Sequence, residues 1–190
     1  MIIIGISGKI GSGKDTVANK IITHFKQYNF KNKKFGHYVK KTVSLLTGIK
    51  TKDIYKRKIK NKYLEEWGMT VGKMFQIVGT DALRNNLHKD TWIITLFNNS
   101  RNQNIIISDV RFKNEADSIK KRGGILIRLE GDPKNLRGKD GRDVNHKSET
   151  DLDNYENFDI IWNNKPPRKN INNLIKIIED KINEKNRQKI

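Results

Sequence analysis

A glycine-rich stretch near the start of the chain has the residue types and spacing that hold phosphate groups. In "GKIGSGKD", Gly8 and Gly13 precede Lys14, which matches the pattern G-x-x-x-x-G-K. Glycines let successive backbone N–H groups turn toward phosphate oxygens, and the lysine bridges terminal phosphates. A plain strand-to-helix turn with an incidental lysine is the less favoured alternative. We therefore expect a nucleotide to contact Gly8, Gly11, Ser12, Gly13, Lys14, Asp15 and Thr16.

The residue after this lysine departs from the usual pattern. A serine or threonine hydroxyl normally stands there and binds Mg²⁺, but this chain has Asp15, and Thr16 follows one residue later. A carboxylate binds Mg²⁺ directly or through water, or it turns away and favours the helix N-terminus. The sequence leaves Asp15 and Thr16 as equal candidates for the metal side.

A second charged pair follows the clearest internal strand. In "NIIISDVRF", the run from Ile105 to Ser108 predicts a buried strand, and Asp109 and Arg111 come at its end. Parallel sheets bind their ligands at the carboxyl ends of strands. We expect both residues to lie in the site; a surface ion pair beside a turn is the alternative.

The spacing of apolar residues predicts the elements that position these groups. Strands are expected over 1–7, 105–108, 125–129 and 158–162. Helices are expected over 15–28, from the polar turn after the second strand to about 121, and over 171–182. The tail after Glu184 is expected to fray. Residues 104–133 form a strand-helix-strand unit, which places a helix on one face of a parallel sheet.

The remaining segments are less specific. Residues 30–63 contain two lysine-rich stretches with helical spacing, and "DTWIITLFNNS" predicts another helix. Residues 137–146 are polar and predict a mobile loop. Residues 70–87 place five apolar side chains on one face, namely Val71, Met74, Phe75, Val78 and Leu83.

Length and composition limit the class of protein. A chain of 190 residues predicts one compact domain, and the absence of cysteine excludes disulfides and thiolate metal sites. Without a signal peptide or an apolar run long enough to span a membrane, we expect a soluble, cytoplasmic protein. The net charge of +18 is interpreted as a solvated surface that suits small anionic substrates; non-specific affinity for nucleic acid is the alternative.

Four motifs in order carry a family resemblance: "GKIGSGKDT", "VGTDALRNNLHKDTWI", "IIISDVRFKNEADSIKKRGG" and "HKSETDLD". They resemble the deoxynucleoside monophosphate kinases of bacteriophages and large DNA viruses, and the "GKD" loop with "SD-x-R" also resembles phosphomevalonate kinase. The resemblance implies a three-layer α/β P-loop kinase fold, an acceptor-binding helical region over about 30–101 and a lid over about 134–150. It further implies ATP, Mg²⁺, a deoxynucleoside monophosphate as acceptor, and a homodimer.

The resemblance also assigns roles to charged residues. Asp109 would organise Mg²⁺ through water, while Arg111 and Arg84 would hold the acceptor phosphate. In the lid, Arg137 and Arg142 would stabilise charge on the transferred group, with Arg128 as a further candidate. A solvated helix arginine at position 84 and a disordered charged loop are the alternatives. No general base is needed, because the acceptor phosphate is already ionised.

Other positions keep two interpretations. Trp92 would line the acceptor base pocket, although a core position is favoured, and Asp81 is less certain. Glu115 would contact the acceptor or pair with a lysine. Asn163 and Asn164 would contact adenine or form a turn. His146–Glu149 would be a hinge or cap, with Ser148 or Thr150 starting a helix.

Two alternative functions remain open. The chain would be a kinase for a non-nucleotide phosphate acceptor, or an ATPase that nucleic acid stimulates.

Overall fold

The computed structural model describes residues 1–131, 147–163 and 171–187, and it divides into two compact units. The first unit combines Met1–Lys33 with the chain from Asn102 onward, and the second is Lys34–Arg101. Each unit has its own buried core and is described by itself. The bounds of the second unit nearly match those of the helical region expected over about 30–101.

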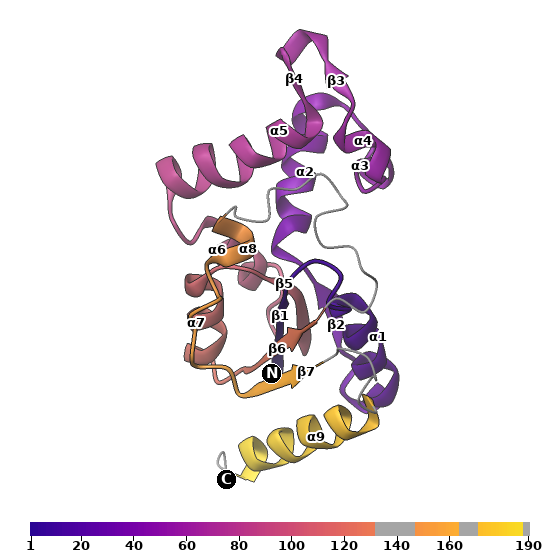
Figure 1. The fold of residues 1–190 in the computed structure, drawn as a ribbon, viewed down its shortest axis with the longest axis vertical. Coiled ribbons are helices and arrows are strands. Elements are labelled where there is room, and N and C mark those ends of the chain that lie inside the picture. Colours follow the sequence, from indigo (N-terminus) through magenta and orange to yellow (C-terminus); the bar gives the residue numbers. More distant parts are fainter. Residues whose placement is uncertain (132–146, 164–170, 188–190) are drawn as a thin grey trace. The chain divides into compact units, whose positions relative to one another are not determined.

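A parallel sheet forms the centre of the first unit (Figure 1). Among the described residues it has five strands in the order β2-β5-β1-β6-β7, and every neighbouring pair is parallel. The strands are β1 (Ile3–Gly8), β2 (Lys31–Lys33), β5 (Ile105–Val110), β6 (Ile125–Glu130) and β7 (Ile160–Asn163). Four of them were predicted. The edge strand β2 was missed because the sequence Lys-Asn-Lys lacks any apolar pattern.

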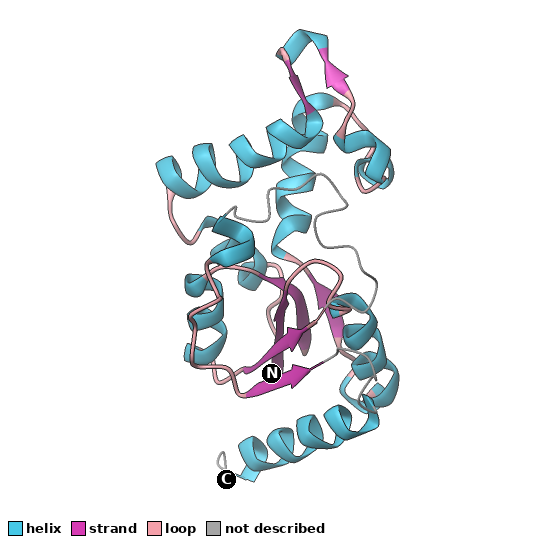
Figure 2. Cartoon of the chain, in the orientation of Figure 1, coloured by secondary structure: helices cyan, strands magenta, loops and turns pink. Residues whose placement is uncertain are grey.

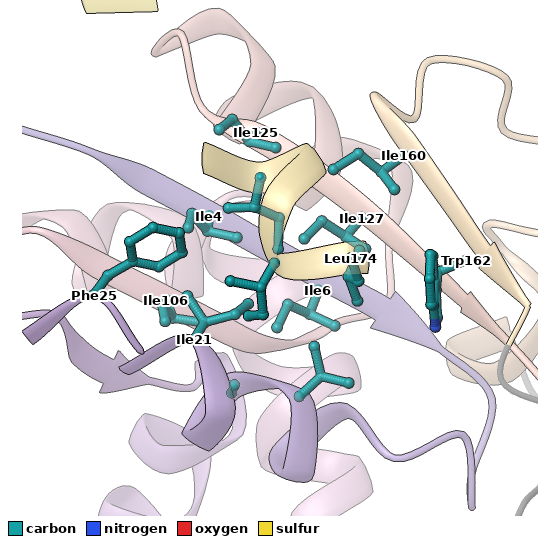
Figure 3. Packing of buried hydrophobic residues seen from close by; sticks show 14 of the residues in the cluster. Ile4, Ile6, Ile21, Phe25, Ile106, Ile125, Ile127, Ile160, Trp162 and Leu174 are labelled. Atoms are coloured by element: carbon teal, nitrogen blue, oxygen red, sulfur yellow. The ribbon is translucent and has the colours of Figure 1, made fainter. Parts of the chain in front are cut away.

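Helices cover both faces of this sheet, as expected for an α/β fold (Figure 2). Helices α1 (Lys14–His24) and α9 (Ile171–Arg187) pack on one face, where the isoleucines of β1 and β6 are buried (Figure 3). Helix α7 (Lys113–Lys121) lies against β1 and β6 on the other face. Gly5 permits this packing, because an added Cβ would lie 2.7 Å from Ile119 Cδ1. The short helix α8 (Lys147–Thr150) also belongs to this unit.

Two predicted helix ends were wrong. The first helix ends at His24, and Lys26–Tyr28 form a separate 3-10 turn instead of continuing it. Helix α9 does not fray after Glu184 but continues to Arg187. Lys185 supports this extension, because its Nζ donates to the carbonyls of Gly123 at 2.8 Å and Gly124 at 3.2 Å.

The second unit is mostly helical. Its helices are α2 (Phe35–Thr47), α3 (Thr51–Ile54), α4 (Arg57–Lys60), a 3-10 turn over Glu65–Trp67, α5 (Val71–Gln76), a π-helix over Ile77–Leu87, and α6 (Thr91–Asn98). A small hairpin of β3 (Tyr63–Leu64) and β4 (Met69–Thr70) was not predicted. On the predicted apolar face, Val71, Met74 and Val78 are buried, whereas Phe75 and Leu83 are only partly buried.

None of the described helices is both long and apolar enough to cross a membrane.

Candidate functional site

The glycine-rich loop joins β1 to α1, as predicted. Gly13 has a φ of 89° and directly precedes the helix, which is a conformation that favours glycine. Gly8 lies close to other backbone, because an added Cβ would be 2.6 Å from the Leu129 carbonyl oxygen. Ser12, within the loop, is fully buried. The loop therefore presents its backbone at the N-terminus of α1, where an anion is stabilised.

Lys14 folds back over this loop. Its Nζ donates hydrogen bonds to the carbonyls of Gly8 at 2.6 Å and Lys9 at 2.8 Å. Burial, reinforced by the Arg111 guanidinium, lowers the pKa of Lys14 from 10.5 to about 8, and nearby carboxylates oppose the shift. Such a lysine is poised to gain an anionic partner, since a phosphate would favour its charged form.

Asp15 turns toward the carboxyl end of β5. Its Oδ1 accepts a hydrogen bond from the Ser108 hydroxyl at 3.0 Å, and Asn32 Oδ1 lies 3.1 Å from the same hydroxyl. Thr16 is exposed. Neither Ser108 nor Asn32 was predicted as a site residue, because serine at a strand end and asparagine in a polar stretch carry no distinctive signal. Which of Asp15 and Thr16 faces the metal stays a prediction.

The carboxylates near Lys14 suit Mg²⁺ in a nucleotide site. Asp15 and Asp109 both act on Lys14 electrostatically, so they lie at the same end of the sheet. Within the described part of the chain, no group of three or more His, Asp or Glu side chains encloses a metal position. Mg²⁺ commonly takes one or two carboxylates together with phosphates and water, so this sparse set fits it.

Glu115 shapes the turn that carries Arg111. Its side chain is 2% exposed and its Oε2 accepts hydrogen bonds from the backbone N–H groups of Arg111 at 2.9 Å and Phe112 at 3.2 Å. These bonds satisfy amides at the start of α7. The sequence predicted contact with the acceptor or a lysine pair; the bonds to backbone reveal a positioning role that was not foreseen.

Arg111 itself contacts α8. Its Nη1 pairs with the Glu149 carboxylate and also donates to the Ser148 carbonyl at 3.4 Å. Glu149 lies in the motif "HKSE", for which only a hinge or cap was predicted. Ser148 and Thr150 lie inside α8, which begins at Lys147, so the prediction that either starts the helix was wrong.

Two further cations lie beside this pair. Lys9 Nζ contacts the Glu149 carbonyl at 2.6 Å and Asp153 Oδ2 at 2.5 Å. Arg128 donates to the Ser7 hydroxyl at 3.1 Å and to Asp153 Oδ1 at 3.0 Å. Arg128 had been a candidate, whereas Lys9 and Asp153 were missed because isolated charges in a highly charged chain give no signal.

Arg84 and Trp92, predicted to bind the acceptor, belong to the second unit. Arg84 is partly buried on the π-helix. Trp92 is 4% exposed and its indole N–H donates to the Gly79 carbonyl at 2.8 Å, which agrees with the favoured core interpretation. Asp81 is exposed, and its carbonyl accepts from the Asn86 side chain at 2.6 Å. The acceptor roles of these residues stay predictions.

Arg137, Arg142, His146 and Asn164 lie outside the described residues. Asn163 is described: it ends β7, opposite Glu130, and is exposed. Its predicted contact with adenine stays a prediction.

Comparisons with known proteins identify relatives. A family model described as "Deoxynucleotide monophosphate kinase" matches residues 31–178. A protein of Acanthamoeba polyphaga mimivirus, called "Putative deoxynucleotide monophosphate kinase", is 33% identical over 197 residues, covering 95% of this chain and 97% of the viral protein.

Solved structures show the fold class. Shikimate kinase from Aquifex aeolicus superposes with a TM-score of 0.51 at 15% identity, covering 96% of each chain. Shikimate kinase from Bacteroides thetaiotaomicron gives 0.52 at 16% identity, covering 96% of this chain and 98% of that one. The predicted fold, a parallel sheet flanked by helices in the manner of P-loop kinases, is confirmed.

Proposed function

The chain belongs to the deoxynucleotide monophosphate kinase family, and from this premise we propose that it phosphorylates a deoxynucleoside monophosphate with ATP. In this reaction an oxygen of the acceptor phosphate forms a bond to the γ-phosphorus of ATP. The bond from that phosphorus to the β–γ bridging oxygen breaks, and ADP leaves. The products are ADP and the deoxynucleoside diphosphate.

The observation that carries the proposal is the meeting of two functional groups at one end of the sheet. The loop with Lys14 follows β1, and the turn with Arg111 follows the adjacent strand β5. A donor triphosphate on the loop and an acceptor phosphate on Arg111 would thus be neighbours. Positioning and neutralisation of charge are the main requirements of phosphoryl transfer.

Mg²⁺ bound with the nucleotide would supply further neutralisation of phosphate charge. Asp15 and Asp109 would hold it from the protein side, in part through water. Ser108 would orient the Asp15 carboxylate through their hydrogen bond. Lys14 would exchange its bonds to loop carbonyls for bonds to phosphate oxygens.

The test is ADP release measured over a panel of acceptors. We expect turnover with at least one of the four common deoxynucleoside monophosphates, and loss of transfer in Lys14→Ala. Arg111→Ala should raise the KM for the acceptor or lower kcat/KM while ATP still binds. Turnover only on a non-nucleotide phosphate ester would contradict the proposed acceptor. ATP hydrolysis that depends on DNA or RNA would contradict the kinase.

A further inference from the structure

Three cations converge at the carboxyl ends of three neighbouring strands, and we call Lys9, Arg111 and Arg128 the cation cluster. Lys9 follows β1, Arg111 follows β5, and Arg128 lies near the end of β6. These strands are adjacent in the sheet, with β1 in the centre. The cation cluster therefore occupies the edge where parallel sheets bind ligands.

Two acidic residues link these cations into one continuous network. Glu149 binds Arg111 through its carboxylate and Lys9 through its carbonyl. Asp153 contacts Lys9 at 2.5 Å through one oxygen and Arg128 at 3.0 Å through the other. The Glu149 side chain is 7% exposed and the Arg128 side chain 13%, so this is not a loose surface pairing.

The charges of the network match those of a bound phosphate. The two carboxylates together carry two negative charges, as does the phosphate of a nucleoside monophosphate once both of its acidic protons are lost. Arginine pairs favourably with either a carboxylate or a phosphate, so the two anions compete for the same donors. Glu149 also acts electrostatically on Lys14, so it lies near the nucleotide loop as well as Arg111.

We propose that the cation cluster is a subsite for a phosphomonoester dianion, and that the carboxylates of Glu149 and Asp153 fill it until the phosphate displaces them. Lys9 and Arg128 thereby join Arg111 as phosphate-binding residues. This inference rests on the proposed function for the identity of the phosphomonoester, the acceptor nucleotide. The subsite itself depends only on the network.

Calorimetric titration with inorganic phosphate, and separately with the four deoxynucleoside monophosphates, tests the subsite. Glu149→Gln and Asp153→Asn remove one competing charge each while preserving side-chain size. We expect each variant to bind the phosphate probe about two- to tenfold more tightly. Asp151→Asn is the matched control, because Asp151 lies in the same segment but accepts from the Lys113 backbone N–H at 2.8 Å. The affinity of the Asp151→Asn variant for the phosphate probe should be unchanged.

Double variants identify the cations. The gain in phosphate affinity from Glu149→Gln should vanish when Arg111→Ala is added. The gain in phosphate affinity from Asp153→Asn should vanish when Arg128→Ala is added. Unchanged or weaker phosphate binding in both single variants would overturn the proposal, since it would mean that the carboxylates only position the cations. A gain that persists in the double variants would also overturn it. Because Asp153 is 39% exposed, its variant should fold even if Glu149→Gln does not.

The two proposals can fail separately. If tighter binding of inorganic phosphate is found but no deoxynucleoside monophosphate is phosphorylated, the subsite stands and the proposed acceptor falls. If turnover is found but the variants bind phosphate no more tightly, the proposed kinase activity is supported. The proposal that phosphate displaces the two carboxylates is then contradicted.

Discussion

At the scale of single residues, the site depends on how charged side chains are partnered before a nucleotide binds. Lys14 donates to two loop carbonyls, and Asp15 accepts from Ser108. Asp15 stands where such loops usually carry a hydroxyl, and the Ser108 hydroxyl of the adjacent strand β5 donates to its carboxylate. This hydrogen bond orients the Asp15 carboxylate before a nucleotide binds.

The lowered pKa of Lys14 predicts that nucleotide binding takes up protons. Burial lowers this pKa to about 8, so at pH 8 about half of the free protein carries a neutral Lys14. A bound triphosphate favours the ammonium form and raises the pKa again. We expect uptake of about half a proton at pH 8, and more at pH 9 than at pH 7.

This uptake is measured by titrating ATP into the protein in buffers of different ionisation enthalpy. Lys14→Arg is the control, because a guanidinium stays charged throughout this range. Proton uptake that does not increase from pH 7 to pH 9 would contradict the expectation.

The lowered pKa of Lys14 also affects folding. The unfolded chain binds this proton more tightly than the folded chain does. The contribution of Lys14 therefore makes the free energy of unfolding rise as pH increases from about 8 toward 10.5.

At the scale of elements, the turn between β5 and α7 shows how a buried carboxylate positions a binding residue. Glu115 accepts from two backbone amides, including that of Arg111. Glu115→Ala would leave these amides without this acceptor and should lower the free energy of unfolding by about 1–3 kcal/mol. It should also raise the acceptor KM more than the ATP KM, because the turn carries Arg111.

Glu115→Gln separates this role from direct contact with substrate. Glutamine keeps an oxygen that accepts from both amides, so denaturant unfolding and the acceptor KM should stay close to those of the unmodified protein. A large loss of acceptor affinity in Glu115→Gln with unchanged stability would instead indicate that the carboxylate binds the acceptor.

The elements that the sequence predicted best were those with a strong local pattern. The apolar runs of β1, β5 and β6 and the glycine spacing of the loop follow from side-chain burial and backbone conformation, so the residues themselves carry the signal. Strand β2 was missed because its stability comes from pairing with β5. Glu149 and Asp153 were missed as partners of cations because their contacts join residues more than 20 positions apart.

At the scale of the whole molecule, hydrogen exchange can test whether the two compact units bind different substrates. Lys14, Asp109 and Arg111 belong to the first unit, whereas Arg84 and Trp92 belong to Lys34–Arg101. If the second unit also binds the acceptor, the acceptor should protect peptides that ATP alone does not. ATP with Mg²⁺ should slow exchange chiefly in the loop after β1 and in α1.

Adding a deoxynucleoside monophosphate should then slow exchange in peptides from residues 34–101, especially the π-helix over Ile77–Leu87. This helix carries Arg84, and local opening is suppressed wherever a ligand binds the closed form. Arg84→Ala provides the control: it should remove the added protection in the second unit while leaving the protection by ATP in the first. Acceptor-dependent protection confined to the first unit would show that the helical region does not bind the acceptor, and that the phosphate contacts near β5 and β6 suffice.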